Sequence, residues 1–217
     1  MTPRPPSRRP QGRHAGITRA AVLDAALAFV DREGLEALSM RRLGGELGVE
    51  AMTLYHHVGS KEALLDGVVE RLLTDLVPER EDAASSWREL LRTSAWALYD
   101  RLAAHPHLIP VVATRPAVTP GTLAVLEREV AALHAAGFAP ARALEIAYAV
   151  IGLVLGHVGV GGRFDDLTGE RSRNLAGADL SDYPLLCRAV EDGVDVDGSS
   201  SFTLALDAVL DGLAPPR

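Results

Sequence analysis

A short stretch near the N-terminus carries side chains suited to contacting DNA. Residues 51–56 read Ala-Met-Thr-Leu-Tyr-His, and at helical spacing Leu54 faces inward while its neighbours face outward. The outward residues mix small, hydroxyl and aromatic groups, which fit base edges and phosphate oxygens. This pattern predicts a helix whose N-terminal end enters the major groove. Its outward side chains are Ala51, Met52, Thr53, Tyr55 and His56.

The residues just before this stretch predict how the helix is held in place. Ser39 is a good N-cap, and Leu43 and Leu47 lie four residues apart on one helix face. Gly48 can adopt the positive φ that ends a helix. Residues 39–61 therefore have the pattern of two short helices joined by a tight turn, which is a helix-turn-helix.

Two longer motifs carry a family resemblance. The first is Leu47-Gly-Val-Glu-Ala-Met-Thr-Leu-Tyr-His-His-Val58 with Ser60-Lys-Glu-Ala-Leu-Leu-Asp66, and it makes residues 17–76 resemble the DNA-binding domain of the tetracycline-repressor (TetR) family. The second is Ala113-Thr-Arg-Pro116, followed by Gly137-Phe138 and a long apolar segment, which resembles the C-terminal domain of the tetracycline repressors. The resemblance implies a ligand-responsive DNA-binding regulator that acts as a homodimer.

The resemblance also assigns roles to residues of the helix-turn-helix. It places Arg41, Ala51 and Met52 where the family contacts base edges, and Thr53, Tyr55 and Lys61 where the family contacts phosphate. Arg41 can present a fork of donors to guanine, whereas Met52 offers only apolar contact. His56 is a further candidate contact. Arg42 is either a DNA contact or a solvated charge.

The effector end of the chain departs from the tetracycline repressors. The resemblance places a magnesium-binding histidine at Val111 and a helping carboxylate near Val160, and both positions are apolar here. We therefore expect no metal site, no cofactor and no magnesium–tetracycline inducer, but a mostly apolar small molecule in a mostly apolar pocket. Residues of these types are more often core or surface residues than ligand contacts, but the candidates to line the pocket are Trp96, Tyr99, His107, His134 and Tyr148.

Hydrophobic periodicity and caps predict an all-α fold with no strands. The expected helices span residues 18–33, 61–77, 86–104, 120–136, 140–158 and 201–213. Thr18 and Ser86 are the expected N-caps of the first and third of these. The expected divisions are a disordered basic arm over residues 1–16, a helix-turn-helix domain over 17–61, a connecting helix over 62–78, and a ligand-binding and dimerisation domain over 79–217.

The helix expected at residues 140–158 is apolar nearly all round, which suggests burial against a partner subunit. Together with the last helix it predicts a helix bundle across a dimer axis, and hence an operator that is an inverted repeat. The predicted interface residues are Ile151, Val154, Leu155, Val158, Phe202, Leu206, Val209 and Leu210.

Charge is distributed unevenly along the chain. The net charge is −7, but residues 1–61 hold nine Lys/Arg and six Asp/Glu, whereas residues 62–217 hold thirteen and twenty-three. The basic part therefore coincides with the helix-turn-helix. Two interpretations of the first sixteen residues, which include Arg4, Arg8, Arg9 and Arg13, stay open: an arm that contacts DNA, or a solvated tail without a role.

Other functional classes find little support in the sequence. No run of about eighteen uncharged apolar residues is present, and the first residues are rich in Arg and Pro, so we expect a cytoplasmic protein without a membrane span. His105 and His107 lack the spacing and carboxylates of a metal site, and no nucleophile motif indicates catalysis. The alternative to a DNA-binding regulator, most simply a repressor, is an all-α carrier or enzyme whose helix-turn-helix no longer reads DNA.

Overall fold

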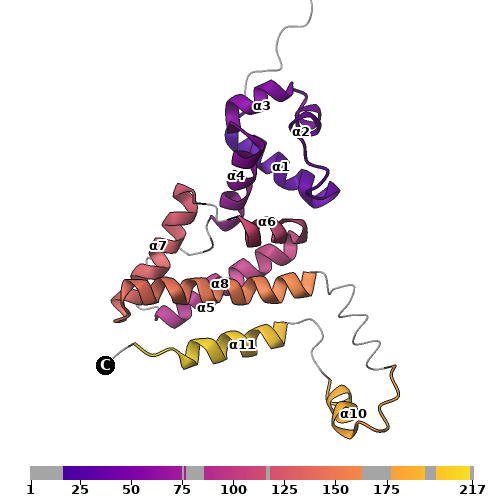
Figure 1. The fold of residues 1–217 in the computed structure, drawn as a ribbon, viewed down its shortest axis with the longest axis vertical. Helices are drawn as coiled ribbons and strands as arrows, with labels where there is room; N and C mark the ends of the chain where they lie inside the picture. The colour runs from indigo at the N-terminus through magenta and orange to yellow at the C-terminus, as the bar shows by residue number, and fades with distance from the viewer. Residues whose placement is uncertain are drawn as a thin grey trace, which may run out of the picture. The chain divides into compact units, whose positions relative to one another are not determined.

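The computed structural model describes residues 17–74, 76, 86–115, 118–162, 177–193 and 199–215, with side chains omitted for 160–162. Every regular element within these ranges is a helix, so the predicted all-α fold is confirmed (Figure 1). The chain divides into two compact units, Met1–Val68 and Val69–Arg217. The division falls inside the expected connecting helix. The predicted basic arm lies outside the described residues.

The first unit contains α1 (Arg19–Glu33), α2 (Met40–Leu47), α3 (Ala51–Val58) and the beginning of α4 (Lys61–Leu73). The predicted caps are present: the Thr18 hydroxyl accepts from the Ala21 N–H, and the Ser39 hydroxyl accepts from the Arg42 N–H. The unit is closed by an apolar core drawn from all four helices. Its fully buried members include Val22, Val30, Leu38, Leu43, Leu54 and Leu64.

The turn between α2 and α3 depends on two glycines. Gly48 ends α2 in the left-handed region, at φ 70° and ψ 28°, as the sequence predicted. Gly44 permits a close approach instead, because the Val49 N–H donates to the Gly44 carbonyl at 2.8 Å. A Cβ atom at Gly44 would lie 2.8 Å from the Val49 carbonyl oxygen, which is a backbone clash. The geometry of the helix-turn-helix therefore requires glycine at position 44.

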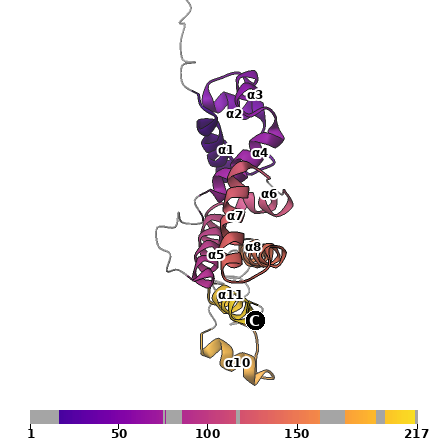
Figure 2. The same ribbon diagram turned by 90° about the vertical axis from the view of Figure 1, so that its left-hand side faces the viewer.

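The second unit is built around one long helix. Its elements after α4 are α5 (Trp87–Ala104), η1 (Pro106–Leu108), α6 (Ile109–Thr114), α7 (Pro120–Ala135), α8 (Pro140–Gly162), α10 (Pro184–Glu191) and α11 (Ser199–Gly212). α8 packs against α5, α6, α7 and α11, and α11 runs alongside α8 (Figures 1 and 2). Three of these elements, η1, α6 and α10, were not among the helices expected from the sequence.

Polar and aromatic contacts fix α11 to α5. The Arg92 guanidinium donates to the Asp207 carboxylate at 2.6 Å, and the Arg88 guanidinium donates to the Leu210 and Leu213 carbonyls at 3.1 and 2.6 Å. Phe202 of α11 stacks on Tyr99 with ring centroids 4.7 Å apart. These contacts bury one face of α11 within its own subunit.

Five residues predicted for the dimer interface lie in this core instead. In a single subunit none of them is more than 2% exposed: Val154, Val158, Phe202, Leu206 and Leu210. A side chain already buried inside one subunit presents no surface to a second, so this part of the prediction was wrong. An apolar stripe at helical spacing indicates burial without indicating which surface covers it. Ile151, Leu155 and Val209 are half-buried, and their interface role stays a prediction.

One described helix, α8, is long and apolar enough to cross a membrane by length and composition, with a mean hydropathy of 1.5 over Pro140–Gly159. The core helix of a water-soluble protein meets the same criteria. α8 supplies Ile146, Ala147, Val150 and Val154 to the core of the second unit. Packing within the second unit accounts for the buried 33% of this stretch.

Candidate nucleic-acid interface and ligand cavity

α3 presents a mixed polar and apolar surface on the side opposite its core anchor. Leu54 is fully buried and fixes the helix, while Met52 is 63% exposed and Tyr55 is 41% exposed. His56 is also exposed, and Ala51 and Thr53 are half-buried. The predicted inward and outward faces of α3 are therefore present. The set of outward groups can make apolar, hydroxyl and ring N–H contacts to a nucleic acid.

The first turn of α3 differs from that of α2. α2 is capped by the Ser39 hydroxyl, but Glu50 at the start of α3 makes no side-chain cap hydrogen bond. The first N–H groups of a helix have no partner within that helix. In α3 the Thr53 N–H donates to the Glu50 carbonyl at 2.9 Å, and the N–H groups before it are left to solvent or to an acceptor such as a phosphate oxygen.

Arg41 and Arg42 have different surroundings although they are neighbours. Arg42 donates to the Glu33 carboxylate and to the Ala37 carbonyl, both at 3.1 Å, and its guanidinium lies 5.0 Å from the centre of the Phe29 ring. Arg41 is exposed, and within the described part of the chain no hydrogen bond or ion pair engages it. The structure thus gives Arg42 a role in holding α2 on α1 and leaves the Arg41 fork open to a ligand.

A second ion pair joins the same two helices, because Arg32 contacts both Glu46 and Glu33. Hydrogen bonds donated by Arg32 and Arg42 lower the pKa of Glu33, and the hydrogen bonds that Arg32 donates to Glu46 and Glu33 raise the pKa of Arg32. These ion pairs are at the surface, so they contribute little to the stability of the fold. Their effect is to fix the direction of α2.

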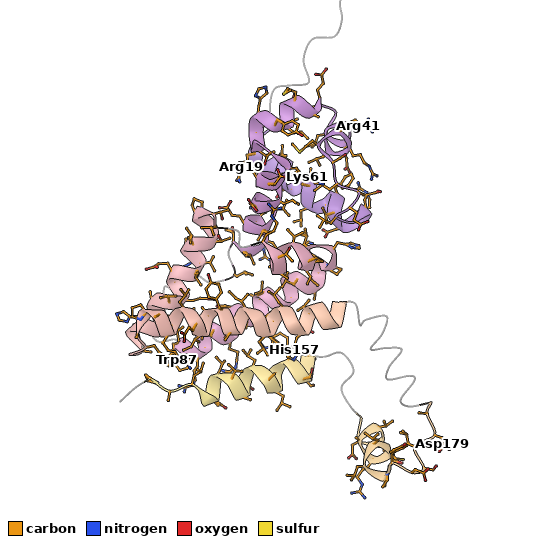
Figure 3. The ribbon with its side chains drawn as sticks, in the orientation of Figure 1. Arg19, Arg41, Lys61, Trp87, His157 and Asp179 are labelled. Atoms are coloured by element: carbon orange, nitrogen blue, oxygen red, sulfur yellow. The ribbon has the colours of Figure 1, made fainter. Side chains whose placement is uncertain are left out.

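Lys61 makes an internal contact in addition to any role at phosphate. Its ammonium donates to the Leu38 carbonyl at 2.7 Å, which ties the start of α4 to the loop before α2. An ammonium has three N–H donors, so two remain for other acceptors. Figure 3 marks Lys61 and Arg41 within the first unit. Sequence reasoning did not anticipate the bond to Leu38.

The arm accounts for the basic character of the N-terminal part. Residues 17–61 contain five Lys/Arg and six Asp/Glu, so the positive charge of residues 1–61 comes from the four arginines of residues 1–16. Attraction to phosphate is dominated by such cations. The positive charge that attracts phosphate is therefore concentrated in those four arginines, whereas residues 17–61 have a small net negative charge.

The second unit holds a cavity of about 200 Å³. Its walls come from the end of α4 and from α5, α6, α7 and α8, and most are aliphatic. The polar side chains among them are those of Ser94, Arg115, Thr122, Glu129 and Tyr148. A mostly apolar cavity with a few polar groups is typical of a small-molecule site.

Glu129 of α7 is the most unusual of these polar residues. It is 7% exposed, and burial raises the pKa of its carboxyl from an ordinary 4.5 to about 7, against opposing effects of Ser94 and Arg128. Glu129 was not among the ligand-binding residues predicted from the sequence. The signal was available, because Glu129 lies three residues after Leu126 and four before Leu133, on the apolar face of the helix.

Most of the predicted ligand residues lie elsewhere. Trp96 and Tyr99 pack on Phe202, and the His157 ring also contacts the Phe202 ring. These aromatic groups join α5, α8 and α11 and do not line the cavity, because they face α11.

The two histidines predicted for the pocket are also outside it. His107 is exposed in η1, and Nδ1 of His134 donates to the Phe138 carbonyl, which follows α7, at 2.9 Å. Tyr148 does line the cavity, although it is 58% exposed. Val111 is buried in α6, and the Val160 side chain lies outside what the structure describes. Of the five residues predicted to line the ligand pocket, only Tyr148 lines this cavity.

The first unit, with its capped α2, tight turn and exposed α3, is that of a helix-turn-helix DNA-binding regulator. Comparison with known proteins agrees. Residues 22–68 match the family described as bacterial regulatory proteins, tetR family, and residues 78–215 match the family described as tetracyclin repressor-like, C-terminal domain. The chain belongs to the TetR family of transcriptional regulators.

Individual relatives extend over nearly the whole chain. The chain is 30% identical to the HTH-type transcriptional repressor DrrR1 of Streptomyces coeruleorubidus, covering 98% of this chain and 82% of that one. It is 31% identical to the tetracycline repressor protein class A of Escherichia coli, covering 90% of each. Its fold matches that of ActR from Streptomyces coelicolor in complex with actinorhodin, with a TM-score of 0.72, 26% identity, and coverage of 91% and 97%.

Proposed function

We propose that this protein is a homodimeric repressor that binds an inverted-repeat operator and is released from it by a mostly apolar small molecule. The observation that carries the proposal is the pairing, in one chain, of an exposed α3 on a helix-turn-helix with an apolar cavity in the second unit. Two relatives named as repressors support repression over activation. A protein of this class acts in the cytoplasm, where its operator is.

At the operator, we assign base contacts to Arg41, Ala51 and Met52. Arg41 is exposed and can meet guanine O6 and N7 with two donors, while Met52 can cover a thymine methyl. Thr53, Tyr55 and Lys61 are assigned to phosphates, with His56 as a further contact. Arg42 is withdrawn from this set because Glu33 and Phe29 hold it.

The dimer is proposed to form through the sides of α8 and α11 that face away from their own subunit. On α8 this side includes Ala149, Gly152 and Gly156, and a Cβ added at either glycine would meet nothing within 4 Å. On α11 it includes Leu204, which is 74% exposed. Small residues allow helices to approach closely, and an exposed leucine gains by being covered. Two such DNA-binding units would read two half-sites.

The switch is proposed to act through α4. Val69, Leu73 and Leu76 form a wall of the cavity, so a bound molecule touches the end of the same helix that begins at Lys61. That end is also tied to its surroundings: the Gly121 N–H of α7 donates to Glu70 at 3.0 Å, and Arg101 of α5 donates to the Leu72 carbonyl at 3.2 Å. A ligand that prefers another position of α4 weakens operator binding, and the operator weakens ligand binding by the same factor.

The proposal is tested by selecting genomic fragments that the purified protein binds and footprinting the tightest one. We expect protection of an inverted repeat with half-site centres one helical turn apart. Arg41→Ala should then lose about 1 to 3 kcal/mol and relax preference at one base pair per half-site, while Lys61→Ala should weaken all sequences alike. Fragments without a shared sequence, or equal loss of specificity in both variants, would contradict the assignment.

A further inference from the structure

The cavity of the second unit has one buried ionisable group among its described walls. Glu129 is 7% exposed, whereas the other charged or titratable lining residues, Arg115 and Tyr148, are partly open to solvent. Water can stabilise the charge of a partly exposed side chain but reaches Glu129 poorly. The chemistry at Glu129 therefore depends on what occupies the cavity.

The protein itself offers Glu129 little compensation for a negative charge. Ser94, which also lines the cavity, has a single hydroxyl proton, and its oxygen lies 2.8 Å from the Leu90 carbonyl to which it donates. The carboxyl group thus competes with a backbone carbonyl for one donor. Arg128, the adjacent residue on α7, also attracts the negative charge, but burial outweighs the effects of both Ser94 and Arg128.

We propose that the cavity binds a largely apolar molecule bearing one basic amine, with the protonated amine paired to the carboxylate of Glu129. The inference rests on the proposed function, because it names the class of effector for the same cavity. The aliphatic walls account for the apolar part of the molecule. The amine supplies the positive charge that the buried carboxyl lacks, and pairing offsets the loss of hydration of both groups.

The other ligand classes fit this site less well. A neutral molecule leaves the carboxyl group without a counter-charge. A ligand carboxylate near Glu129 would add a second negative charge to a poorly hydrated space, which is unfavourable. It could be accommodated only toward Arg115, whose side chain is half-buried. A protonated amine is the ligand class whose binding the buried carboxylate of Glu129 strengthens.

The test uses three probes with one naphthalene skeleton: 1-naphthylmethylamine, 1-naphthalenemethanol and 1-naphthoic acid. Their dissociation constants for the full-length protein are measured by calorimetry at pH 7.5 without DNA. A charge-assisted hydrogen bond in a buried site should make the amine bind ~10- to 100-fold more tightly than the alcohol. Glu129→Gln should abolish that preference while leaving the affinity for the alcohol within about threefold.

Glu127 provides the matched control, because it is an exposed carboxylate on the same helix two residues away. Glu127→Gln should keep the full preference for the amine. Glu129→Asp retains the charge on a shorter side chain and should keep part of the preference, which guards against misreading a folding defect in Glu129→Gln. Far-UV circular dichroism confirms that each variant is folded.

Equal binding of amine and alcohol, tighter binding of the acid, no binding of any probe at millimolar concentration, or a preference that survives in Glu129→Gln would each overturn the inference. The proposed function has a separate readout, which is operator binding by the wild-type protein without any probe. Loss of the amine preference with intact operator binding refutes only the effector class. An amine preference without specific operator binding refutes only the regulator.

Discussion

Replacing the buried carboxyl of Glu129 should change how stability depends on pH. In the folded protein the pKa of Glu129 is raised from 4.5 to about 7 by burial, so the group is neutral when folded and ionised when unfolded over that interval. Because the folded state holds the proton more tightly than the unfolded state, the protonated Glu129 contributes its full share of the folding stability below pH 4.5. That contribution is lost as the pH rises through about 7. Each pKa unit corresponds to about 1.4 kcal/mol, so the loss amounts to about 3 kcal/mol.

Glu129→Gln removes the ionisation and should flatten this part of the curve. We expect the variant and the wild type to differ little near pH 5, and the variant to be more stable by up to about 3 kcal/mol at pH 8. Urea unfolding followed by circular dichroism at half-unit pH intervals measures the difference. The total protein concentration must be held fixed, because a dimer unfolds in a concentration-dependent way.

Taking the difference between variant and wild type cancels the titration of all other groups. Glu127→Gln, at an exposed position of the same helix, should leave the pH dependence unchanged. A constant offset between Glu129→Gln and wild type from pH 5 to 8 would refute the reasoning, since it would mean that Glu129 is ionised in the folded state throughout. A variant that is less stable at pH 8 than at pH 5, relative to wild type, would refute its sign.

Three further outcomes follow from the fold and the charge distribution. Gly44→Ala should lower the unfolding midpoint and abolish operator binding, because its Cβ would lie 2.8 Å from the Val49 carbonyl oxygen. In the control Gly45→Ala the new Cβ meets nothing within 4 Å, so that variant should be neutral or stabilising. Equal unfolding midpoints for the two variants would contradict the requirement for glycine at position 44. Leu204→Asp, at a 74% exposed position on α11, should give folded monomers by light scattering. The control Leu185→Asp, at a 77% exposed position on α10, should leave a dimer. A dimer in both variants would show that α11 is not part of the interface. Deleting residues 1–16, with their four arginines, should reduce the salt slope of DNA binding by about 0.9 for each phosphate they neutralise, and an unchanged slope would make them a tail without a role.

The sequence predicted those features of the fold that depend on local chemistry. Ser39, Thr18 and Ser86 cap the helices they were expected to cap, and Gly48 ends α2 in the left-handed region. A side-chain cap and a positive φ involve residues within a few positions of each other. They can therefore be read from spacing alone.

Features that depend on distant packing were not predicted. The apolar stripe of Phe202, Leu206 and Leu210 was expected to meet a second subunit but is covered by its own, because periodicity does not identify the covering surface. Trp96 was expected in the ligand pocket and instead faces Phe202, which is more than a hundred residues away in sequence. Gly44 is required only because Val49 folds back onto it, and no helix propensity signals such a contact.

The central claim is that α3 reads a specific DNA sequence, and the ratio of two affinities tests it most directly. The dissociation constant of the wild-type protein is measured for the selected inverted repeat and for the same duplex with both half-sites scrambled, in the same physiological salt. We predict a ratio of at least ~10³, within the range typical of specific DNA-binding proteins. A ratio near one at that salt concentration would mean that the protein binds DNA only through its charge, and would contradict the account.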